Sequence, residues 1–307
     1  MKNSPDNYTL AVFALIVANM IGGGAPLASK ILLRELPPMT ILFLRLTIML
    51  VILMPLSLTR FRHLWIHRKQ LVLLGLFWVG NLSLFIIGIK FTTAIASSII
   101  YLGVPILVLF EERMMNKSKL LLWQVIGIGL GCTGALFVVL ESLGTQSGFG
   151  TFHGNILLLL AIVSYSFYLT YSKRLSVHVS PLGLTVGALV SGWAVSLVFM
   201  VFFDGVTGLV HVPNLSIASW VSLLYVGIFL GVAMYFLNQW GIRHTSAVVA
   251  GAMLYVGTFT AWASGVLFLS EKITFLMIAG GALLVVGVFL TSMMPLLTLR
   301  KHSMKRG

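Results

Sequence analysis

Ten apolar stretches, each long enough to cross a membrane as a helix, constrain this chain more than any other feature. A hydrocarbon core about 30 Å thick takes roughly 20 helical residues at 1.5 Å per residue. The stretches are residues 11–30, 39–58, 71–90, 93–111, 120–140, 154–173, 182–203, 217–239, 246–268 and 273–294. They are too long for the strands of a membrane barrel and do not alternate. The sequence predicts an all-α, polytopic membrane helical bundle of ten transmembrane helices.

The composition agrees with a membrane protein. Hydrophobic residues make up 59% of the 307 positions and charged residues 9%, which leaves more apolar surface than a soluble domain can bury. In a soluble protein a formal net charge of +13 indicates binding to nucleic acid. Here we expect the cations on short loops against anionic lipid headgroups, with no nucleic-acid partner. The single cysteine, Cys132, excludes an intrachain disulfide.

The first stretch has a second interpretation. Lys2, the apolar run from Ala11 to Ile21 and the small residues "GAPLAS" also match a cleavable signal peptide. The internal repeat described below favours retention, because it gives this stretch a partner elsewhere in the chain.

Positive charges predict the orientation. If the amino terminus is cytoplasmic, four of the 20 Lys and Arg residues fall outside, namely Lys30, Arg34, Lys90 and Lys272. Arg45 lies within a stretch, and the other fifteen fall inside. Cytoplasmic loops of membrane proteins carry an excess of Lys and Arg over the loops on the other side. We therefore expect a multi-pass protein of the cell inner (plasma) membrane with both termini in the cytoplasm.

The chain repeats itself at an offset of 153 residues. "KFTTA" at 90–94 returns as "RHTSA" at 243–247, and Gly127 and Gly134 correspond to glycines 153 positions later. Upstream the offset falls to about 143, pairing Ser29-Lys30 with Ser172-Lys173. Five stretches per copy is an odd number, so the second copy enters the membrane inverted, a construction characteristic of secondary transporters. We expect one repeat at 9–140, another at 153–294, and a basic cytoplasmic tail at 295–307.

Several short motifs occur in a fixed order along the chain. They are "LPPMTILFLR" with Arg45, the two repeated turns above, "SP" at 180–181, "LSEKIT" at 269–274 with Glu271, and the glycines of the fifth and tenth stretches. In this order and spacing the chain resembles the drug/metabolite transporter superfamily, specifically ten-span proteins built from two EamA domains. The resemblance implies that helices 1, 3 and 4 of one repeat and 6, 8 and 9 of the other enclose a central substrate cavity.

The chain also departs from this family pattern. It reads "IGGG" where the family often has Trp-Gly in the first span, and Ser164-Tyr165 where the family has Trp-Ala. Ser118 replaces a residue that is commonly acidic. These departures concern the substrate subfamily rather than the fold.

Polar and aromatic residues recur at helical spacings within six of the stretches, as expected along a transport path. Buried amides need a partner or water. The alternative is ordinary packing, in which aromatic rings fill gaps between helices or belong to the interfacial belt. The predicted substrate-contacting side chains are Asn19, Trp78, Asn81, Tyr101, Tyr165, Tyr168, Tyr235, Asn238, Tyr255 and Trp262.

Glycine and proline predict interruptions in two helices. Gly23 and Pro26 fall within the first stretch and Pro105 within the fourth. Backbone groups freed at such breaks are tolerated in a membrane only against protein or a wet cavity. We expect these residues to act as hinges, with a packing kink as the alternative.

Arg45 and Glu271 are expected to be structural. Arg45 sits about six residues, roughly 9 Å, from the outer end of the second helix, so its guanidinium could snorkel to the headgroups. An ion pair joining the repeats is a second possibility, and direct substrate binding a third.

Signals for an enzyme, a metal or a cofactor are weak. "GLGCTG" at 129–134 satisfies G-x-G-x-x-G, but it lies inside a membrane span and fits a helix-packing face better than a dinucleotide loop. The chain has no Walker A lysine, H-E-x-x-H motif or cysteine cluster, and its seven histidines are scattered. We expect no enzyme activity, cofactor or metal.

The expected function is secondary transport of a small amphiphilic metabolite, an amino acid or similar, by alternating access. Lipophilic drug efflux is one alternative, and a membrane enzyme or sensor is another. The seven acids all fall in loops or near span ends, so no carboxylate carries a proton across and obligatory proton coupling is not expected. Glu112 and Glu271 are the acids that could reach a wet cavity.

Overall fold

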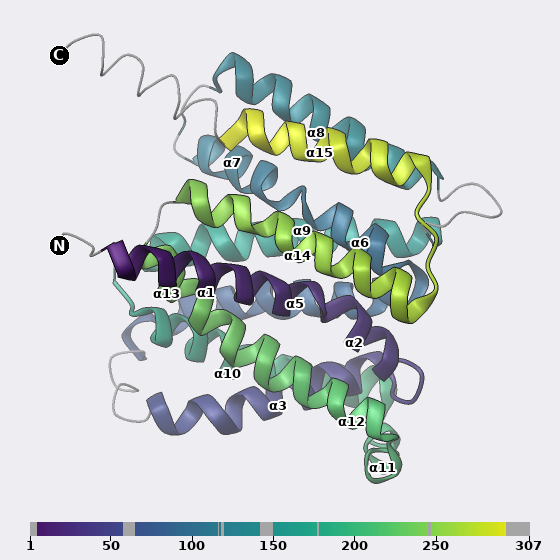
Figure 1. The fold of residues 1–307 in the computed structure, drawn as a ribbon. Helices are drawn as coiled ribbons and strands as arrows, with labels where there is room; N and C mark the ends of the chain where they lie inside the picture. The colour runs from purple at the N-terminus through teal and green to yellow at the C-terminus, as the bar shows by residue number, and fades with distance from the viewer. Residues whose placement is uncertain are drawn as a thin grey trace.

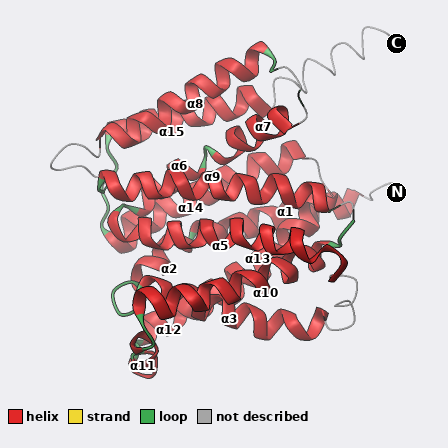
Figure 2. Cartoon of the chain, turned by 180° about the vertical axis from the view of Figure 1, so that it is seen from behind, coloured by secondary structure: helices red, strands yellow, loops and turns green. Residues whose placement is uncertain are grey.

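The computed structural model describes residues 5–57, 65–115, 117, 120–141, 150–176, 178–244 and 247–292. Within these ranges every regular element is a helix, and none is a strand, as Figure 2 shows from behind. The predicted fold class, an all-α membrane helical bundle, is confirmed.

In the first half of the chain the described residues form seven α-helices and a short 3-10 turn, η2 (Trp65–His67). The helices are α1 (Pro5–Gly23), α2 (Ala25–Leu32), α3 (Pro38–Ser57), α5 (Arg68–Phe91), α6 (Ala94–Tyr101), α7 (Val104–Met115) and α8 (Leu122–Glu141).

The second half has the same order of long elements with additional short ones. They are α9 (Phe152–Leu175), α10 (Pro181–Phe199), η3 (Met200–Asp204), α11 (Thr207–Val210), η4 (Val212–Asn214), α12 (Ile217–Leu224), η5 (Tyr225–Ala233), α13 (Met234–His244), α14 (Ala247–Leu269) and α15 (Phe275–Ser292). Residues of η3 and η5 are π-helical continuations of the helices before them.

Seven helical stretches in the described residues are long and apolar enough to cross a membrane, and three shorter apolar helices accompany them. The seven are Tyr8–Leu32, Pro38–Pro55, Arg68–Phe91, Ala94–Met115, Phe152–Leu175, Leu182–Asp204 and Ile217–Leu237; the shorter ones are Leu122–Phe137, Tyr255–Leu269 and Phe275–Thr291. Each overlaps one of the predicted stretches.

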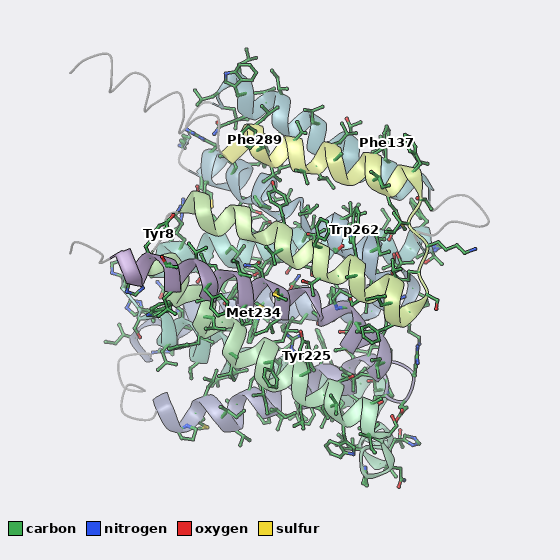
Figure 3. The ribbon with its side chains drawn as sticks, in the orientation of Figure 1. Tyr8, Phe137, Tyr225, Met234, Trp262 and Phe289 are labelled. Atoms are coloured by element: carbon green, nitrogen blue, oxygen red, sulfur yellow. The ribbon has the colours of Figure 1, made fainter. Side chains whose placement is uncertain are left out.

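The outer surface is apolar, as a lipid-facing surface must be. Phe259 is 78% exposed and Phe275 82%, values that a soluble protein avoids for side chains of this size. In Figure 3 the side chains that project outward from α8 and α15, including the half-exposed Phe289, consist almost wholly of carbon.

The two halves pack against each other with an approximate two-fold symmetry. Contact of α5 with α9 corresponds to contact of α13 with α1, and contact of α7 with α9 corresponds to contact of α14 with α1. Contact of α10 with α5 likewise corresponds to contact of η5 with α3. Corresponding helices run in opposite directions, so the packing is that of an inverted repeat.

The pair α8 and α15 lies side by side at one edge of the molecule in both views (Figures 1 and 2). A Cβ atom added at Gly127 would lie 2.6 Å from the carbonyl oxygen of Gly287, and one at Gly134 would lie 2.6 Å from that of Gly280. Only glycine permits backbones to approach so closely. The glycines that match in the sequence repeat therefore meet at this crossing.

The bundle has two ends, which we name by their elements. At the terminal end α1 begins and α15 ends; at the distal end lie the α2–α3 turn and the residues 270–274 between α14 and α15 (Figure 1). Thr93, Thr151 and Ser216 accept N–H bonds at the distal starts of α6, α9 and α12, and Ser180 does so at the start of α10. These side chains satisfy donors that a helix start leaves unpaired.

Both predicted interruptions are present. The first membrane helix breaks at Gly24, between α1 and α2, and the fourth breaks between α6 and α7. Pro26 and Pro105 are each the second residue after the break. Tyr225 Oη donates to the carbonyl oxygen of Ile21 at 2.5 Å, so a side chain from the second half satisfies the first break. The role of Gly23, Pro26 and Pro105 as hinges stays a prediction.

Candidate functional site

Six of the ten predicted substrate-contacting side chains gather where the two halves meet, and we call them the aromatic cluster. They come from α5, α6, α9 and α13, which correspond to helices 3, 4, 6 and 8 of the bundle. The cluster consists of Trp78, Asn81, Tyr101, Tyr165, Tyr168 and Tyr235.

The rings of the cluster contact one another in a continuous series. Trp78 stacks on Tyr168 with ring centroids 6.2 Å apart and meets Tyr235 edge-on at 6.1 Å. Tyr165 stacks on Tyr168 at 5.9 Å and lies 6.3 Å from Tyr101. Such pairs form a polarisable, largely apolar wall with hydroxyl groups at its edges, which suits an amphiphilic ligand.

Hydrogen bonds fix two of the phenols. The indole N–H of Trp78 donates to Tyr235 Oη at 3.1 Å, and Asn81 Nδ2 donates to Tyr101 Oη at 2.6 Å. Asn81 Nδ2 also donates to the carbonyl oxygen of Ala161 at 2.9 Å, so both amide protons are used. Within the described residues the phenolic protons of Tyr101 and Tyr235 have no hydrogen-bond acceptor.

Arg45, on α3, lies beside this cluster. Its side chain is 8% exposed, and α3 packs against α5 and η5. Among the described residues it has neither an ion pair nor a hydrogen bond, and its Nε is fully buried. An ion pair, one of the possibilities for Arg45, is therefore not seen among the described residues. The structural role of Arg45 stays a prediction.

The remaining predicted contacts lie elsewhere. Asn19 Nδ2 donates to the carbonyl oxygen of Leu15 in its own helix at 2.8 Å. Trp262 donates to Ser98 Oγ at 3.0 Å, joining α14 to α6, and Tyr255 Oη lies 3.4 Å from the carbonyl oxygen of Val285 on α15. The side chain of Asn238 lies outside the part of the chain whose side chains the structure describes.

Tyr225 is a residue of this region that the sequence did not mark. The residues that follow it at helical spacing, Ile228, Phe229 and Val232, are apolar, and Ser222 is the polar residue one turn before it. It begins the π-helical segment η5, and its hydroxyl bonds the broken first helix. Single-turn π-helical distortions frequently occur at functional sites.

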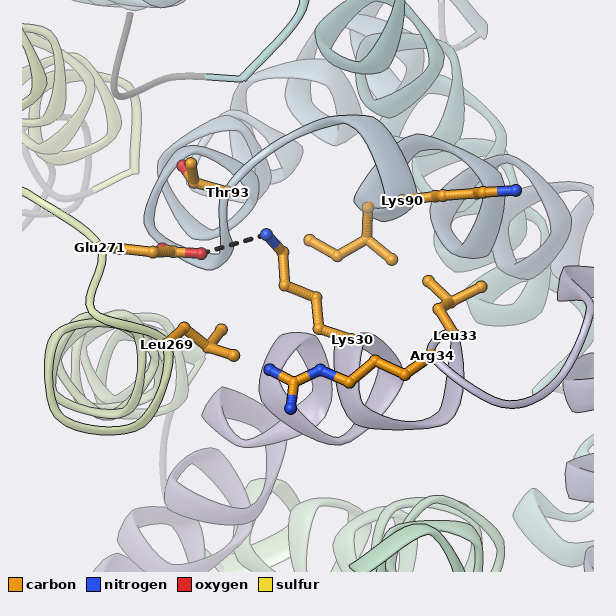
Figure 4. A pocket seen from close by; sticks show the side chains of 8 residues that line it. Lys30, Leu33, Arg34, Lys90, Thr93, Leu269 and Glu271 are labelled. Atoms are coloured by element: carbon orange, nitrogen blue, oxygen red, sulfur yellow. Dashed lines mark ion pairs between the residues drawn. The ribbon is translucent and has the colours of Figure 1, made fainter. Parts of the chain in front are cut away.

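A pocket of about 360 Å³ opens at the distal end (Figure 4). Its polar lining consists of Lys30, Arg34, Lys90, Thr93 and Glu271, from α2, α5, the start of α6 and the α14–α15 connection. Three cations against one carboxylate give it a positive character.

Glu271 joins the two halves at this pocket. It lies 3.2 Å from Lys30 Nζ, and its two oxygens accept the backbone N–H groups of Ala94 and Ile95 at 2.8 and 3.0 Å. The carboxylate thus occupies the N-terminus of α6, where the helix dipole favours negative charge. These contacts favour the predicted structural role of Glu271.

Glu111 is the acid that the sequence did not single out. It lies one turn before the end of α7, is 4% exposed, and bonds Ser166 Oγ at 2.5 Å and Thr170 Oγ1 at 2.8 Å on α9. Glu112 instead forms an exposed pair with Lys173 at 2.6 Å. No group of three or more His, Cys, Asp or Glu residues in the described part of the chain could hold a metal ion.

Comparisons with known proteins agree on the kind of protein. A model described as the EamA-like transporter family matches residues 9–140 and 152–293. A Bacillus subtilis protein, uncharacterized transporter YetK, is 27% identical over 66% of this chain, and this match spans 61% of YetK, less than two thirds of its length. Another from the same organism, uncharacterized transporter YoaV, is 24% identical over 92% of this chain and 96% of its own.

One solved crystal structure superimposes with a TM-score of 0.62 over 92% of this chain and 96% of its own. The two sequences are 17% identical, so this likeness shows the fold alone.

Proposed function

Because the chain belongs to the EamA-like transporter family, which matches nearly its whole length, we propose that it is a secondary transporter of a small amphiphilic metabolite. The substrate is an amino acid or a similar compound, and alternating access between the two inverted halves moves it across the cell inner membrane. Both termini lie in the cytoplasm, and export is the direction.

The observation that carries this proposal is the aromatic cluster at the junction of the halves. Indole and phenol rings supply apolar contact area, while the amide and hydroxyl groups among them orient a polar end. A multiply charged metabolite finds too few charged partners there. The packing of α5 on α9 and of α13 on α1 places the cluster where relative movement of the halves changes access.

The transporter works without obligatory proton coupling, in this proposal. Glu111 is buried, but it lies near the terminal end of α7, and both its oxygens already bond hydroxyl groups of α9. A proton carrier has to face both sides of the membrane in turn. The test uses protein in liposomes with equal substrate inside and outside and a pH step. Equilibration that ignores the step supports the proposal, and protonophore-sensitive accumulation contradicts it.

Glu111→Gln sharpens this test. The amide oxygen accepts from Thr170 and the amide N–H donates to Ser166, so the variant keeps both contacts without a titratable proton. We expect equal transport by wild type and variant at pH 6 and pH 8. Loss of transport in a folded variant would assign a coupling role to Glu111.

Two other functions fit the sequence less well. Lipophilic drug efflux fits the apolar rings, but a lipophilic drug does not need the polar groups of Arg45 and Asn81. A metal-dependent enzyme or sensor needs a set of ligands, and the described residues include no group of three or more His, Cys, Asp or Glu that could hold a metal ion.

The main experiment is substrate counterflow in proteoliposomes, preceded by thermal stabilisation across a metabolite panel. Trp78→Phe removes the indole donor to Tyr235 inside the cluster. Trp193→Phe is the matched control, because Trp193 donates to Thr47 Oγ1 at 2.9 Å outside the cluster. We expect Trp78→Phe to lower uptake about fivefold, since a lost hydrogen bond is worth roughly 1 kcal/mol. Trp193→Phe should leave uptake within about twofold, because the bond it loses lies outside the cluster. Equal uptake in both variants would move the site elsewhere.

A further inference from the structure

The most unusual group in the molecule is the guanidinium of Arg45. A buried charge inside a membrane bundle is normally paired, because an isolated one has a large desolvation cost. Arg45 is 8% exposed and has no ion pair or hydrogen bond among the described residues. Its five N–H donors are therefore available to a partner that the chain itself does not supply.

The neighbouring groups are donors as well. Tyr101 Oη already accepts from Asn81, and Tyr235 Oη already accepts from Trp78. Their phenolic protons have no acceptor among the described residues. Both phenols lie within electrostatic range of Arg45, and α3, which carries Arg45, packs against α5 and η5. One unpaired guanidinium and two O–H groups thus share this region without an acceptor among the described residues.

We propose that Arg45, with Tyr101 and Tyr235, binds a carboxylate group of the transported substrate. This inference rests on the proposed transport function and narrows its substrate to compounds with one anionic group next to an apolar body. A planar carboxylate matches the fork of a guanidinium and accepts phenolic protons with its remaining lone pairs. One guanidinium balances a single negative charge, so a carboxylate fits better than a doubly charged phosphate.

The distal pocket supports the same substrate class. Its single carboxylate, Glu271, is occupied by Lys30 and the start of α6, whereas Arg34 and Lys90 add positive charge. A cleft lined by one sign of charge raises the local concentration of the opposite one. Lys90 and Asn81 are both on α5, nine residues or about 13 Å apart along the helix.

The experiment compares compounds that differ only in the anionic group. The probes are L-phenylalanine against L-phenylalaninamide, 3-phenylpropanoate against 3-phenylpropanamide, and L-leucine against L-leucinamide. Thermal stabilisation and counterflow are measured for the full chain, for Arg45→Met and for Arg45→Lys. We expect the carboxylates to bind wild type at least about 30-fold more tightly than the amides, and Arg45→Met to lose this preference. Arg45→Lys keeps the preference with weaker binding, because lysine lacks the planar fork.

The melting temperature without ligand separates a binding role of Arg45 from a structural one, because the two roles predict opposite effects of Arg45→Met. If Arg45 has no protein partner, Arg45→Met removes an uncompensated buried charge, and the melting temperature rises or stays unchanged. A clear fall would show that Arg45 stabilises the bundle and would overturn the assignment. Equal binding of amides and carboxylates would overturn it too and leave the transport proposal intact. Arg45-dependent binding of carboxylates without any uptake would keep the assignment and overturn transport.

Discussion

The two ends of the bundle join the halves in different ways. At the distal end three carboxylates each lie on a helix start of the opposite half: Glu271 on α6, Asp204 on α3 and Glu35 on α12. At the terminal end the described contacts of this kind are the exposed pair of Glu112 with Lys173 and the hydroxyl bonds of Glu111. A carboxylate on a helix start has both backbone donors and the helix dipole to stabilise it.

The repeat explains why the difference matters. Lys30 corresponds to Lys173 by the offset of about 143, and Glu271 corresponds to position 118 by the offset of 153. Position 118 is a serine, outside the described residues, so Lys173 has no acid at the equivalent place and pairs with Glu112 instead. In a symmetric molecule both ends would close equally well. Among the described residues, carboxylates lie on helix starts of the opposite half at the distal end, and we call this arrangement the acidic latch. It favours closure of that end.

The largest expected effect follows from Glu271→Gln. The variant loses the charge that binds Lys30 and the start of α6, which we expect to lower stability by about 2 kcal/mol and the melting temperature by about 5 °C. It also favours opening of the distal end. The measurement is thermal unfolding, together with maleimide labelling of a cysteine placed at Leu269 in a Cys132→Ser background.

Lys173→Met supplies the matched control for this comparison. It removes a cation at the corresponding position of the other half, and labelling at Leu269 should not change. Equal labelling in Glu271→Gln and wild type would contradict the idea of a distal latch.

The second prediction concerns a variant that adds an equivalent acid at the terminal end. Ser118→Glu places an acid at the sequence position that corresponds to Glu271, just as Lys173 corresponds to Lys30. We expect a smaller effect, about 1 kcal/mol of added stability and a two- to fivefold slower counterflow, because both ends then resist opening. Ser118→Gln serves as the uncharged control. Faster counterflow in Ser118→Glu alone would show that the ends are not in competition.

Much of this architecture could be predicted from the sequence, because membrane solvation leaves few alternatives. Length and apolarity predicted the spans, and the glycines of "GLGCTG" predicted a helix-packing face, which the α8–α15 crossing displays. The pattern that defines a helical face, however, does not indicate which other helix packs against that face. Asn81 and Trp262 have similar patterns around them, yet only Asn81 contacts the aromatic cluster.

The charged side chains show the same limit. Counting residues from a span end gives the depth of Arg45 and Glu111 but not their direction. Arg45 is 8% exposed within the bundle, and Glu111 is 4% exposed although its neighbour Glu112 is 30% exposed. Direction depends on contacts between helices far apart in the sequence, which a periodic pattern does not contain.

The third prediction concerns the terminal pair itself. Lys173 is 72% exposed and Glu112 30%, and exposed pairs contribute about 0 to 1 kcal/mol. We expect Lys173→Met to change the melting temperature by less than about 2 °C and to leave uptake within about twofold. Measurement at low and high salt checks the reason, because screening should abolish whatever difference there is. A large loss of stability would mean that the terminal end is held as firmly as the distal one.

The smallest expected effect concerns Glu35 and tests whether all distal carboxylates matter equally. The hydroxyl and the backbone N–H of Ser216 donate to Glu35 at 2.5 and 2.9 Å and lower the pKa of its carboxyl. A lowered pKa in the folded state means that the contact stabilises the protein above the ordinary range of glutamate, near pH 4.3, and that this stabilisation fades as the pH falls through the lowered value. We therefore expect wild type to melt slightly above Glu35→Gln at pH 7, with the difference fading as the pH falls below the ordinary range of glutamate. Because Glu35 is exposed, solvent screens the contact, and the difference should stay well below that of Glu271→Gln. A difference that persists at low pH, where the carboxyl is protonated, would assign the effect to side-chain shape rather than to charge.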